Sequence, residues 1–352
     1  MSNYSKWTSY ILLFLVLILF MDFVCAFDDS IDDIITITDD NVNVSLTVSS
    51  YSELQNKLDS GSLNINLGDK EFVPDSVHNI KVNNDNVVIR GSSSFKCVFN
   101  AKNDNASILT VNGNNVRLEN IVFKNCDSIR WGGAVRINGN SCSLVNCEFI
   151  GNNGHFGGLG VANDADYILV RNCYFEDNHA DNPTEDSGGM GGAIDSHGSY
   201  GNYINCTFVS NSAVLRGGAI GFLVGHDNNV LECTFINNTS PVGGALYLVN
   251  TGSKLVIRNS RFINNSAVQK GGAIYNDADI EIDSCIFSGN LAGDGGCICN
   301  RGDLTLNWSS FISNFADNYG GVIYNTNKFN ICFSNFTRNN ADLVDVFLIL
   351  KN

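Results

Sequence analysis

The stretch Lys254–Asn276 reads KLVIRNSRFINNSAVQKGGAIYN, and its parts return along most of the chain. It contains three short β-type runs, Leu255–Ile257, Asn259–Ile263 and Gly272–Tyr275, each bounded by Asn, Ser or Gly. Runs of this length between turn residues are typical of strands and are too short for a helix with one buried face. Three strands and three turns in a period of about 25 residues describe one coil of a parallel β-helix.

Three positions mark the repeat. A phenylalanine recurs at spacings of 24 to 33 residues, at Phe123, Phe149, Phe175, Phe208, Phe235, Phe262, Phe287, Phe311 and Phe336. From Phe149 onward an asparagine stands three residues later, at Asn152, Asn178, Asn211, Asn238, Asn265, Asn290, Asn314 and Asn339. A Gly-Gly pair then follows, beginning at Gly132, Gly157, Gly217, Gly243, Gly271, Gly295 and Gly320, and it is delayed to Gly191 in the coil that has an insertion. Leucine-rich repeats have a similar period, but they carry an L-x-x-L-x-L core and a helical segment that this repeat lacks.

Each marked position has a structural interpretation. Alternate side chains of a strand share a face, so the phenylalanines point inward and stack about 4.8 Å apart from coil to coil. Asn tolerates the left-handed conformation of a tight corner, and stacked Asn side chains can form amide ladders. The Gly-Gly pair fits a corner where no Cβ is tolerated. The sequence therefore predicts an all-β fold: a right-handed, single-stranded parallel β-helix of about ten coils over residues 49–352.

A solenoid must cover its ends, because open strand edges pair with other chains. The stretch Tyr51–Leu58 predicts an N-terminal capping helix, with Ser52 as its N-cap and Gly61 just beyond its end. Strands are expected to follow at Leu63–Leu67, Val87–Ile89 and Ile108–Val111. The apolar run Phe347–Leu350 predicts one more short strand, which either closes the last coil or forms an exposed edge.

Residues 1–26 have the pattern of a signal peptide. Lys6 precedes an apolar run from Tyr10 to Met21, and Val24-Cys25-Ala26 suits a cleavage site. The run is shorter than the roughly 20 residues of a membrane span. We therefore expect export to the cell surface or the extracellular space, with contact to the membrane only through this segment if it stays uncleaved. Residues 27–48 form an acidic leader segment, which leaves 49–352 for the solenoid.

Composition narrows the class of partner. The formal net charge is −15, with 21 Lys and Arg against 36 Asp and Glu. Nucleic acid and anionic membranes need clustered basic residues, so neither is an expected partner. A hydrophobic content of 44% with only 3 prolines excludes a disordered chain.

The 12 cysteines follow the repeat more than they follow a disulfide framework. Five of them stand two residues before the Phe, at Cys147, Cys173, Cys206, Cys233 and Cys285, where other coils have Ser260, Ser309 and Ser334. A position that accepts Cys or Ser favours a small side chain, so we expect free, buried thiols. Cys297 and Cys299 form a C-x-C pair, which is a weak pattern for a metal site without a nearby His.

The insertion Glu176–Met190 is the one irregular loop among the coils, and it is acidic. Its carboxylates, Asp181, Glu185 and Asp186 among them, are the best sequence candidates for a recognition loop. Clustered carboxylates can also bind Ca²⁺, but no EF-hand spacing is present, and a solvated loop is the plainer interpretation. No other metal and no cofactor is predicted.

Parallel β-helices also include enzymes that act on polysaccharides, and glycoside hydrolysis needs a positioned pair of carboxylates. Asp195 and His197 are the catalytic candidates here. Further acidic and His residues share their region, namely Asp164, Asp166, His226 and Asp227. The plainer interpretation of each is a turn residue.

The motif F-x-x-N-x-A followed by G-G-A-I-Y, as in Phe262–Ala267 and Gly271–Tyr275, resembles the chlamydial polymorphic outer-membrane protein repeat. It also resembles the Asn/Thr-rich adhesin-like surface proteins of methanogenic archaea, which share the cap-helix pattern at Tyr51–Leu67. The resemblance covers roughly residues 50–340 and carries over no catalytic residue. It implies a non-catalytic, adhesin-like surface β-helix that contacts cells, surfaces, proteins or glycans. A polysaccharide lyase or glycoside hydrolase of the β-helix type is the alternative.

Overall fold

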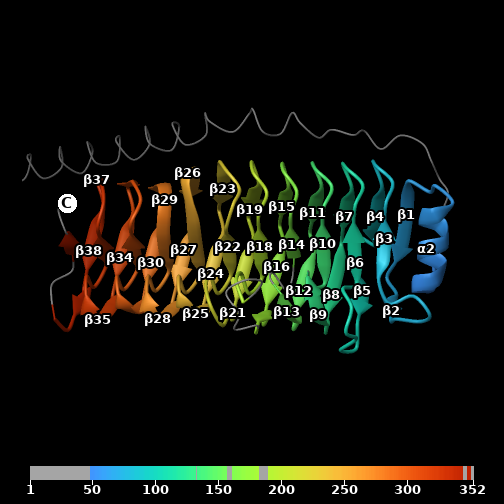
Figure 1. The fold of residues 1–352 in the computed structure, drawn as a ribbon, viewed down its shortest axis with the longest axis horizontal. Helices are drawn as coiled ribbons and strands as arrows, with labels where there is room; N and C mark the ends of the chain where they lie inside the picture. The colour runs from blue at the N-terminus through green and yellow to red at the C-terminus, as the bar shows by residue number, and fades with distance from the viewer. Residues whose placement is uncertain (1–47, 132, 157–160, 182–188, 344–346, 350–352) are drawn as a thin grey trace, which may run out of the picture. The chain divides into compact units, whose positions relative to one another are not determined.

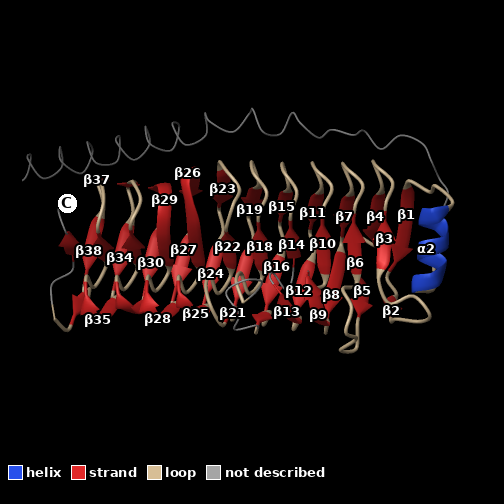
Figure 2. Cartoon of the chain, viewed as in Figure 1, coloured by secondary structure: helices blue, strands red, loops and turns tan. Residues whose placement is uncertain are grey.

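The computed structural model describes residues 48–131, 133–156, 161–181, 189–343 and 347–349. In these residues short parallel strands stack coil upon coil, and one helix covers the N-terminal end of the stack (Figures 1 and 2). The predicted parallel β-helix of about ten coils is confirmed. The predicted signal peptide and nearly all of the leader segment lie outside the described residues.

The strands form three sheets that run along the solenoid. The largest, called here the wide sheet, has 20 strands. They are β1 (Asn64–Gly68), β3 (Ile80–Val82), β4 (Val88–Gly91), β6 (Leu109–Val111), β7 (Arg117–Glu119), β10 (Val135–Ile137), β11 (Ser143–Val145), β14 (Val161–Asn163), β15 (Leu169–Arg171), β18 (Ile194–Ser196), β19 (Asn202–Ile204), β22 (Ile220–Phe222), β23 (Asn228–Leu231), β26 (Leu246–Arg258), β29 (Ile274–Asp283), β32 (Ile298–Asn300), β33 (Leu304–Asn307), β36 (Ile323–Asn325), β37 (Phe329–Cys332) and β40 (Phe347–Ile349). A typical coil contributes two of these strands, and β26 and β29 each run through the corner between them.

The second sheet carries the repeated phenylalanines and is called the phenylalanine sheet. Its 11 strands are β2 (Glu71–Phe72), β5 (Cys97–Asn100), β8 (Ile121–Lys124), β12 (Glu148–Ile150), β16 (Tyr174–Glu176), β20 (Thr207–Val209), β24 (Thr234–Ile236), β27 (Arg261–Ile263), β30 (Ile286–Ser288), β34 (Ser310–Ile312) and β38 (Asn335–Thr337). Every described pairing is parallel and joins equivalent residues, such as Phe208 with Phe235.

The third sheet has 9 strands, which the sequence pattern did not reveal. They are β9 (Asp127–Trp131), β13 (Asn153–Phe156), β17 (His179–Ala180), β21 (Ser212–Ala213), β25 (Thr239–Val242), β28 (Ser266–Lys270), β31 (Leu291–Asp294), β35 (Phe315–Tyr319) and β39 (Asn340–Ala341). A regular coil therefore has four strands, and the prediction of three was wrong. In most of these strands the buried residue is a single alanine, such as Ala267 or Ala316, which gives too little hydrophobic contrast to mark a strand.

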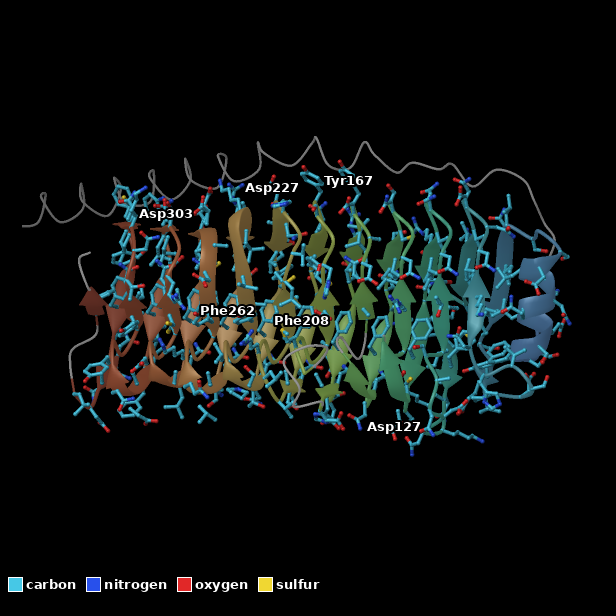
Figure 3. All side chains as sticks on the ribbon, viewed as in Figure 1. Asp127, Tyr167, Phe208, Asp227, Phe262 and Asp303 are labelled. Atoms are coloured by element: carbon cyan, nitrogen blue, oxygen red, sulfur yellow. The ribbon has the colours of Figure 1, made fainter. Side chains whose placement is uncertain are left out.

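The phenylalanine column is the centre of the core. From Phe149 to Phe311 successive ring centroids lie 4.7–4.8 Å apart and the rings are nearly parallel. Figure 3 shows Phe208 and Phe262 inside the stack. Phe72 and Phe99 extend the column toward the N-terminus, beyond the nine phenylalanines found by period. Each fully buried ring contributes about 1.5–3 kcal/mol.

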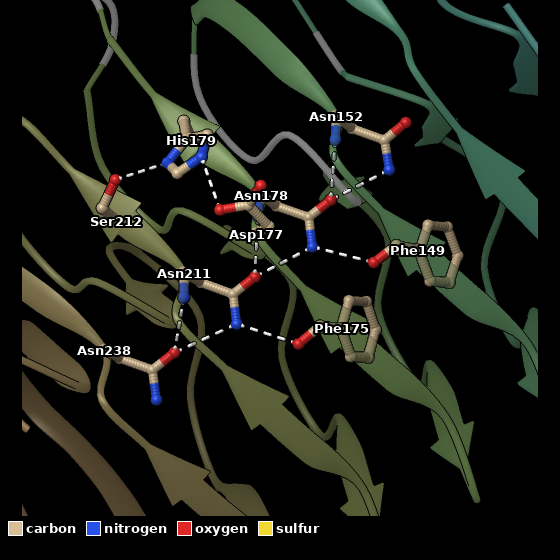
Figure 4. A network of polar contacts seen from close by, with 9 residues as sticks. All are labelled: Phe149, Asn152, Phe175, Asp177, Asn178, His179, Asn211, Ser212 and Asn238. Atoms are coloured by element: carbon tan, nitrogen blue, oxygen red, sulfur yellow. Dashed lines mark hydrogen bonds and ion pairs between the residues drawn. The ribbon is translucent and has the colours of Figure 1, made fainter. Parts of the chain in front are cut away.

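The asparagine column forms a buried amide ladder (Figure 4). Asn178 Nδ2 donates to Asn211 Oδ1 at 2.8 Å, and Asn211 Nδ2 donates to Asn238 Oδ1 at 3.0 Å. The same Nδ2 atoms also donate to phenylalanine carbonyl oxygens, Asn211 to that of Phe175 at 3.0 Å. The ladder continues without interruption from Asn152 to Asn339. The predicted amide ladder is confirmed.

The prediction that these asparagines adopt the left-handed conformation was wrong. The positive φ falls on the residue before each of them, as at Ser210 (54°) and Asn237 (55°). The left-handed residue turns the chain, and the next side chain can then point inward to join the ladder. Two other corners of the coil also have positive φ. One lies three residues before the Phe and is called here the Phe−3 corner. The other lies eight residues before it and is called the Phe−8 corner.

The Gly-Gly pair fills a fourth corner, and its two residues have different reasons to be glycine. Gly217 has a φ of 65°, in the left-handed region that favours glycine. A Cβ on Gly218 would lie 2.2 Å from the carbonyl oxygen of Gly244 in the next coil. The predicted exclusion of Cβ from this corner is confirmed.

The N-terminal end is covered by α2 (Tyr51–Asp59), as predicted. It buries Tyr51, Leu54 and Leu58, and the Tyr51 ring lies 5.5 Å from that of Phe99. Its N-cap is Ser50, whose side chain accepts a hydrogen bond from Glu53 N, so the prediction of Ser52 was wrong. Ser52 lies in the first turn and donates to Asp75 at 2.7 Å instead.

The apolar run near the C-terminus forms β40, which pairs with β36. The Phe347 ring packs edge-on against that of Phe336 at 4.8 Å. Of the two expected roles for this run, this packing supports closure of the last described coil.

The described cysteines are free thiols, ten buried and Cys332 partly exposed. In the position two residues before the Phe, Cys147 Sγ donates to the carbonyl oxygens of Leu118 and Val145. Ser260 Oγ makes the equivalent bond to Arg258 O at 2.9 Å, which explains why Cys and Ser alternate there. Burial raises the thiol pKa, to about 12 at Cys285.

Replacing Asn211 with Ala should lower the free energy of unfolding by about 2–3 kcal/mol. The change removes the buried hydrogen bonds that the Asn211 side chain makes with Asn178, Asn238 and Phe175. Chemical denaturation followed by circular dichroism measures the loss. Asn339→Ala is the matched control, because Asn339 is the last described rung and is partly exposed, so its loss should be clearly smaller. Equal losses would contradict a buried ladder.

Thiol titration should find one fast-reacting cysteine in the chain from residue 27 at pH 8. Cys332 is partly exposed, whereas burial and raised pKa protect thiols such as Cys285 and Cys126. The remaining thiols should react with an aromatic disulfide reagent only after guanidinium unfolds the chain. A native protein in which several thiols react quickly would contradict this packing.

Candidate functional site

The two catalytic candidates lie together on the outer face of the wide sheet. Asp195 lies in β18, where its outward-pointing position is in register with Ala162 on one side and Gly221 on the other. Two coils away in either direction the same position carries a large side chain, Arg136 or Tyr247. Asp195 lies between these small neighbours and is only 4% exposed, and the position bounded by Ala162, His197 and Gly221 is called here the notch.

His197 contacts Asp195 and is itself partly exposed to solvent. Its Nε2 lies 3.2 Å from Asp195 Oδ2, and its side chain is 32% exposed. The other carboxylate oxygen, Asp195 Oδ1, is buried and has no hydrogen-bond partner among the described residues. Burial raises the pKa of the Asp195 carboxyl, and the contact with His197 opposes that shift. The hydrogen bond to Asp195 in turn raises the pKa of His197.

A second carboxylate stands next to this pair. Asp164 contributes to the raised pKa of both Asp195 and His197, and its Oδ2 pairs with Arg136 at 2.9 Å. Of the six polar candidates from the sequence, Asp164, Asp195 and His197 therefore lie near one another. A buried carboxyl group held by a His can exchange a proton with a bound molecule, which is the chemistry of a general acid or base.

The other polar candidates, Asp166, His226 and Asp227, are turn residues, which agrees with their plainer interpretation. Asp166 Oδ1 accepts from Ser199 N at 2.7 Å, and Asp227 has a φ of 54°. The backbone of His226 donates to Ser199 Oγ at 3.1 Å. All three lie near the Phe−8 corner, and their contacts shape the turn.

The acidic insertion is shorter than the sequence suggested. Residues 176–180 belong to the regular coil: Asp177 occupies a left-handed corner, Asn178 joins the ladder, and His179 Nδ1 lies 2.7 Å from Ser212 Oγ (Figure 4). Asp181 accepts from Asn153 Nδ2 at 3.3 Å, whereas Glu185 and Asp186 lie outside the described residues. In the part of the chain that the structure describes, no three His, Cys, Asp or Glu side chains are placed to hold a metal ion.

A second group of outward side chains forms a small packed cluster beyond the notch. The rings of Tyr247 and Tyr275 stack at 5.3 Å, and Cys299 takes the next place in register, before Tyr324. Arg216 lies over the Tyr247 ring at 5.2 Å, and Arg301 Nη1 donates to the Tyr275 hydroxyl at 3.0 Å. Because Tyr247 and Tyr275 are only 5% and 7% exposed, this cluster stabilises the coil stack.

Two exposed aromatic pairs were missed by the sequence analysis. Tyr167 and Tyr200 stack at 4.9 Å in the Phe−8 corner, and Trp308 and Phe333 stack at 4.3 Å in the Phe−3 corner. All four have a φ between 48° and 59°. In the Phe−3 corner the other coils carry Asn120, Asn146, Asn172, Asn205, Glu232, Asn259 and Ser284. In the sequence, an aromatic residue at the Phe−3 corner, where most coils have Asn, could have revealed the Trp308–Phe333 pair.

Stability alone does not explain these pairs. The left-handed conformation is disfavoured by roughly 1–2 kcal/mol for each bulky residue, and Asn tolerates it better. A stacked aromatic pair gains about 0.5–1.5 kcal/mol. The gain from one stack therefore does not exceed the cost for its two residues, so stacking alone does not account for aromatic residues in these corners.

Comparisons with known proteins agree with the fold. The family model of the Chlamydia polymorphic membrane protein repeat matches residues 259–277, the coil in which the sequence showed the resemblance. No curated protein matches the chain. Within the described residues no helix is long and apolar enough to cross a membrane.

Solved structures with the same fold include the catalytic domain of a GH87 α-1,3-glucanase in complex with nigerose. It has a TM-score of 0.51 at 10% identity, over 88% of this chain and 69% of that chain. PfbA, a surface adhesin of Streptococcus pneumoniae, has a TM-score of 0.42 at 11% identity, over 86% of this chain and 91% of that one. The tailspike protein of E. coli bacteriophage HK620 has a TM-score of 0.47 at 13% identity, over 83% and 62%. The likeness to the glucanase domain, at 10% identity, shows a shared fold alone.

The pH dependence of stability tests the Asp195–His197 contact. Because the pKa of His197 is raised above 6.5 by folding, its stabilisation is present below pH 6.5 and is lost as the pH rises through the raised value. The raised pKa of Asp195 also makes the free energy of unfolding fall as the pH rises, but it does so in the acid range above pH 3.8. At pH 5.5 wild type should melt at a higher temperature than His197→Gln, which reflects a difference of about 1 kcal/mol or less in the free energy of unfolding. This difference in melting temperature should disappear by pH 8.5. A gap that widens with pH would contradict the contact.

Proposed function

We propose that this chain is a secreted or cell-surface, adhesin-like β-helix protein that contacts cells, surfaces or extracellular glycans without catalysis. The observation that carries the proposal is the regularity of the coils. The repeated Phe, Asn and Gly residues are used by contacts between coils, so the remaining outward side chains form an extended, in-register surface. Such surfaces are what solenoid proteins use for binding.

The match of one coil to a polymorphic membrane protein repeat supports a surface location. The net charge of −15 favours solubility outside the cell and disfavours acidic partners. Free buried thiols fit this chain because its stability comes from in-register coil contacts and does not need disulfides. The acidic loop with Asp181, Glu185 and Asp186 is proposed as one recognition element, because loops on a rigid scaffold commonly carry binding residues.

An enzyme that cleaves polysaccharides is the second candidate, and the notch supports it. A buried carboxyl with a raised pKa, held by His197 and close to Asp164, is an arrangement that acid–base chemistry requires. It would act on a glycan by proton transfer from or to the Asp195–His197 pair.

One experiment separates the two functions. The chain from residue 27 is immobilised and exposed to whole cells and to a panel of glycans, with both retention and product release measured. We expect retention without product. Release of sugar products that is lost in Asp195→Ala and in His197→Ala would overturn the adhesin-like function in favour of an enzyme. The absence of both retention and product would contradict each function.

The loop proposal has its own test in the same assay. Changing Asp181, Glu185 and Asp186 together to Ala should weaken retention, with the unchanged melting temperature as a control for folding. Unchanged retention would place recognition elsewhere on the surface.

A further inference from the structure

We propose that the exposed Trp308–Phe333 pair is a stacking platform for an uncharged sugar ring. This inference rests on the proposed function, because it gives a surface-binding protein its ligand class and the place where that ligand binds. The proposal starts from two observations: aromatic residues occupy a corner where the repeat has Asn, and their side chains face solvent.

The two rings face each other, so a flat ligand can pack only against the ring surface that each partner leaves uncovered. Trp308 and Phe333 come from adjacent coils, and their rings lie 4.3 Å apart with 12° between the planes. Their exposed fractions are 54% and 75%, the latter close to the largest of any apolar side chain described. The C–H groups of a pyranose ring pack against an exposed aromatic surface of this kind, and the rings give contact area with little conformational freedom to lose.

The strands next to the pair supply hydrogen-bonding groups without charge. The strands before the corner, β33 and β37, point Thr305, Asn307 and Asn330 outward. The strands after it, β34 and β38, point Ser310 and Asn335 outward. Amide and hydroxyl groups both donate and accept, which is what sugar hydroxyls need.

This neutrality belongs to the two coils of the pair, because Glu281 and Asp283 of the preceding coil are the register neighbours of Thr305 and Asn307. The Tyr167–Tyr200 pair, in contrast, has Asp166, His226 and Asp227 beside it. Figure 3 shows Tyr167 at the same outer edge as Asp227. Of the two exposed pairs, Trp308–Phe333 is therefore the one suited to a neutral ligand, and the net charge of −15 disfavours an acidic glycan.

The repeat itself provides the test variant. Trp308→Asn with Phe333→Asn restores the residue that five other coils carry in this corner, where it has a positive φ without an aromatic ring. The variant should fold, and its melting temperature should equal or exceed that of wild type, because Asn tolerates this conformation. Val268→Asn is the matched control, since Val268 is an apolar residue 79% exposed on β28.

Binding is measured by calorimetry with protein made in bacteria, from residue 27 onward. The probes are neutral hexasaccharides of β-1,4-linked glucose, mannose and N-acetylglucosamine, with a galacturonate hexasaccharide as the charged comparison. We expect wild type and Val268→Asn to bind at least one neutral probe, and the double variant to bind it about tenfold more weakly. The galacturonate probe should bind more weakly than the neutral one.

Two results would overturn the inference: no neutral probe binds wild type, or the double variant binds like wild type. In the second case, a lower melting temperature of the double variant would mean that the pair serves coil stacking. Retention on whole cells distinguishes failure of the platform from failure of the proposed surface-binding function. If wild type and double variant are retained equally on cells, the platform is excluded and the surface-binding function stands. If wild type is not retained, the function itself fails.

Discussion

The structure depends on the exact repetition of one contact, the hydrogen bond between buried asparagine amides of successive coils. Each amide in the column from Asn152 to Asn339 has its Nδ2 and Oδ1 engaged, and the column runs beside the stacked phenylalanines. A slip of one residue would bury unpaired amides and turn the phenylalanines outward. The ladder therefore fixes the register of every coil it joins.

This fixed register explains why function has to be sought on the outside. The interior positions are filled by Val, Ile, Leu, Phe, Ala and Cys side chains and by the asparagine ladder, which contact the neighbouring coils. On the outside, each position of the coil becomes a column of side chains in register. Unusual residues are then visible in their columns: Asp195 lies buried between Ala162 and Gly221, and Trp308 occupies a corner that usually has Asn.

The two unusual features favour different chemistry. At the notch the Asp195 carboxyl is buried, its pKa is raised by burial, and it lies 3.2 Å from His197. The Trp308–Phe333 pair is exposed and uncharged, and its left-handed backbone has a cost that stacking alone does not offset. A binding surface uses the second kind of feature directly, whereas the first has the form that acid–base chemistry needs.

The sequence by itself determined the coil. The period of Phe, Asn and Gly-Gly reports contacts that every coil repeats, so the fold, the inward Phe column, the amide ladder and the capping helix were all predictable. The tertiary structure alone decided what the repeat does not record. It placed the left-handed φ before Asn211 and not on it, and it revealed the third sheet, where a single buried Ala such as Ala267 gives no hydrophobic pattern. It also brought Asp164 close to the Asp195–His197 pair and stacked Trp308 on Phe333, because side chains 25 or more residues apart become neighbours only when the coils are in register.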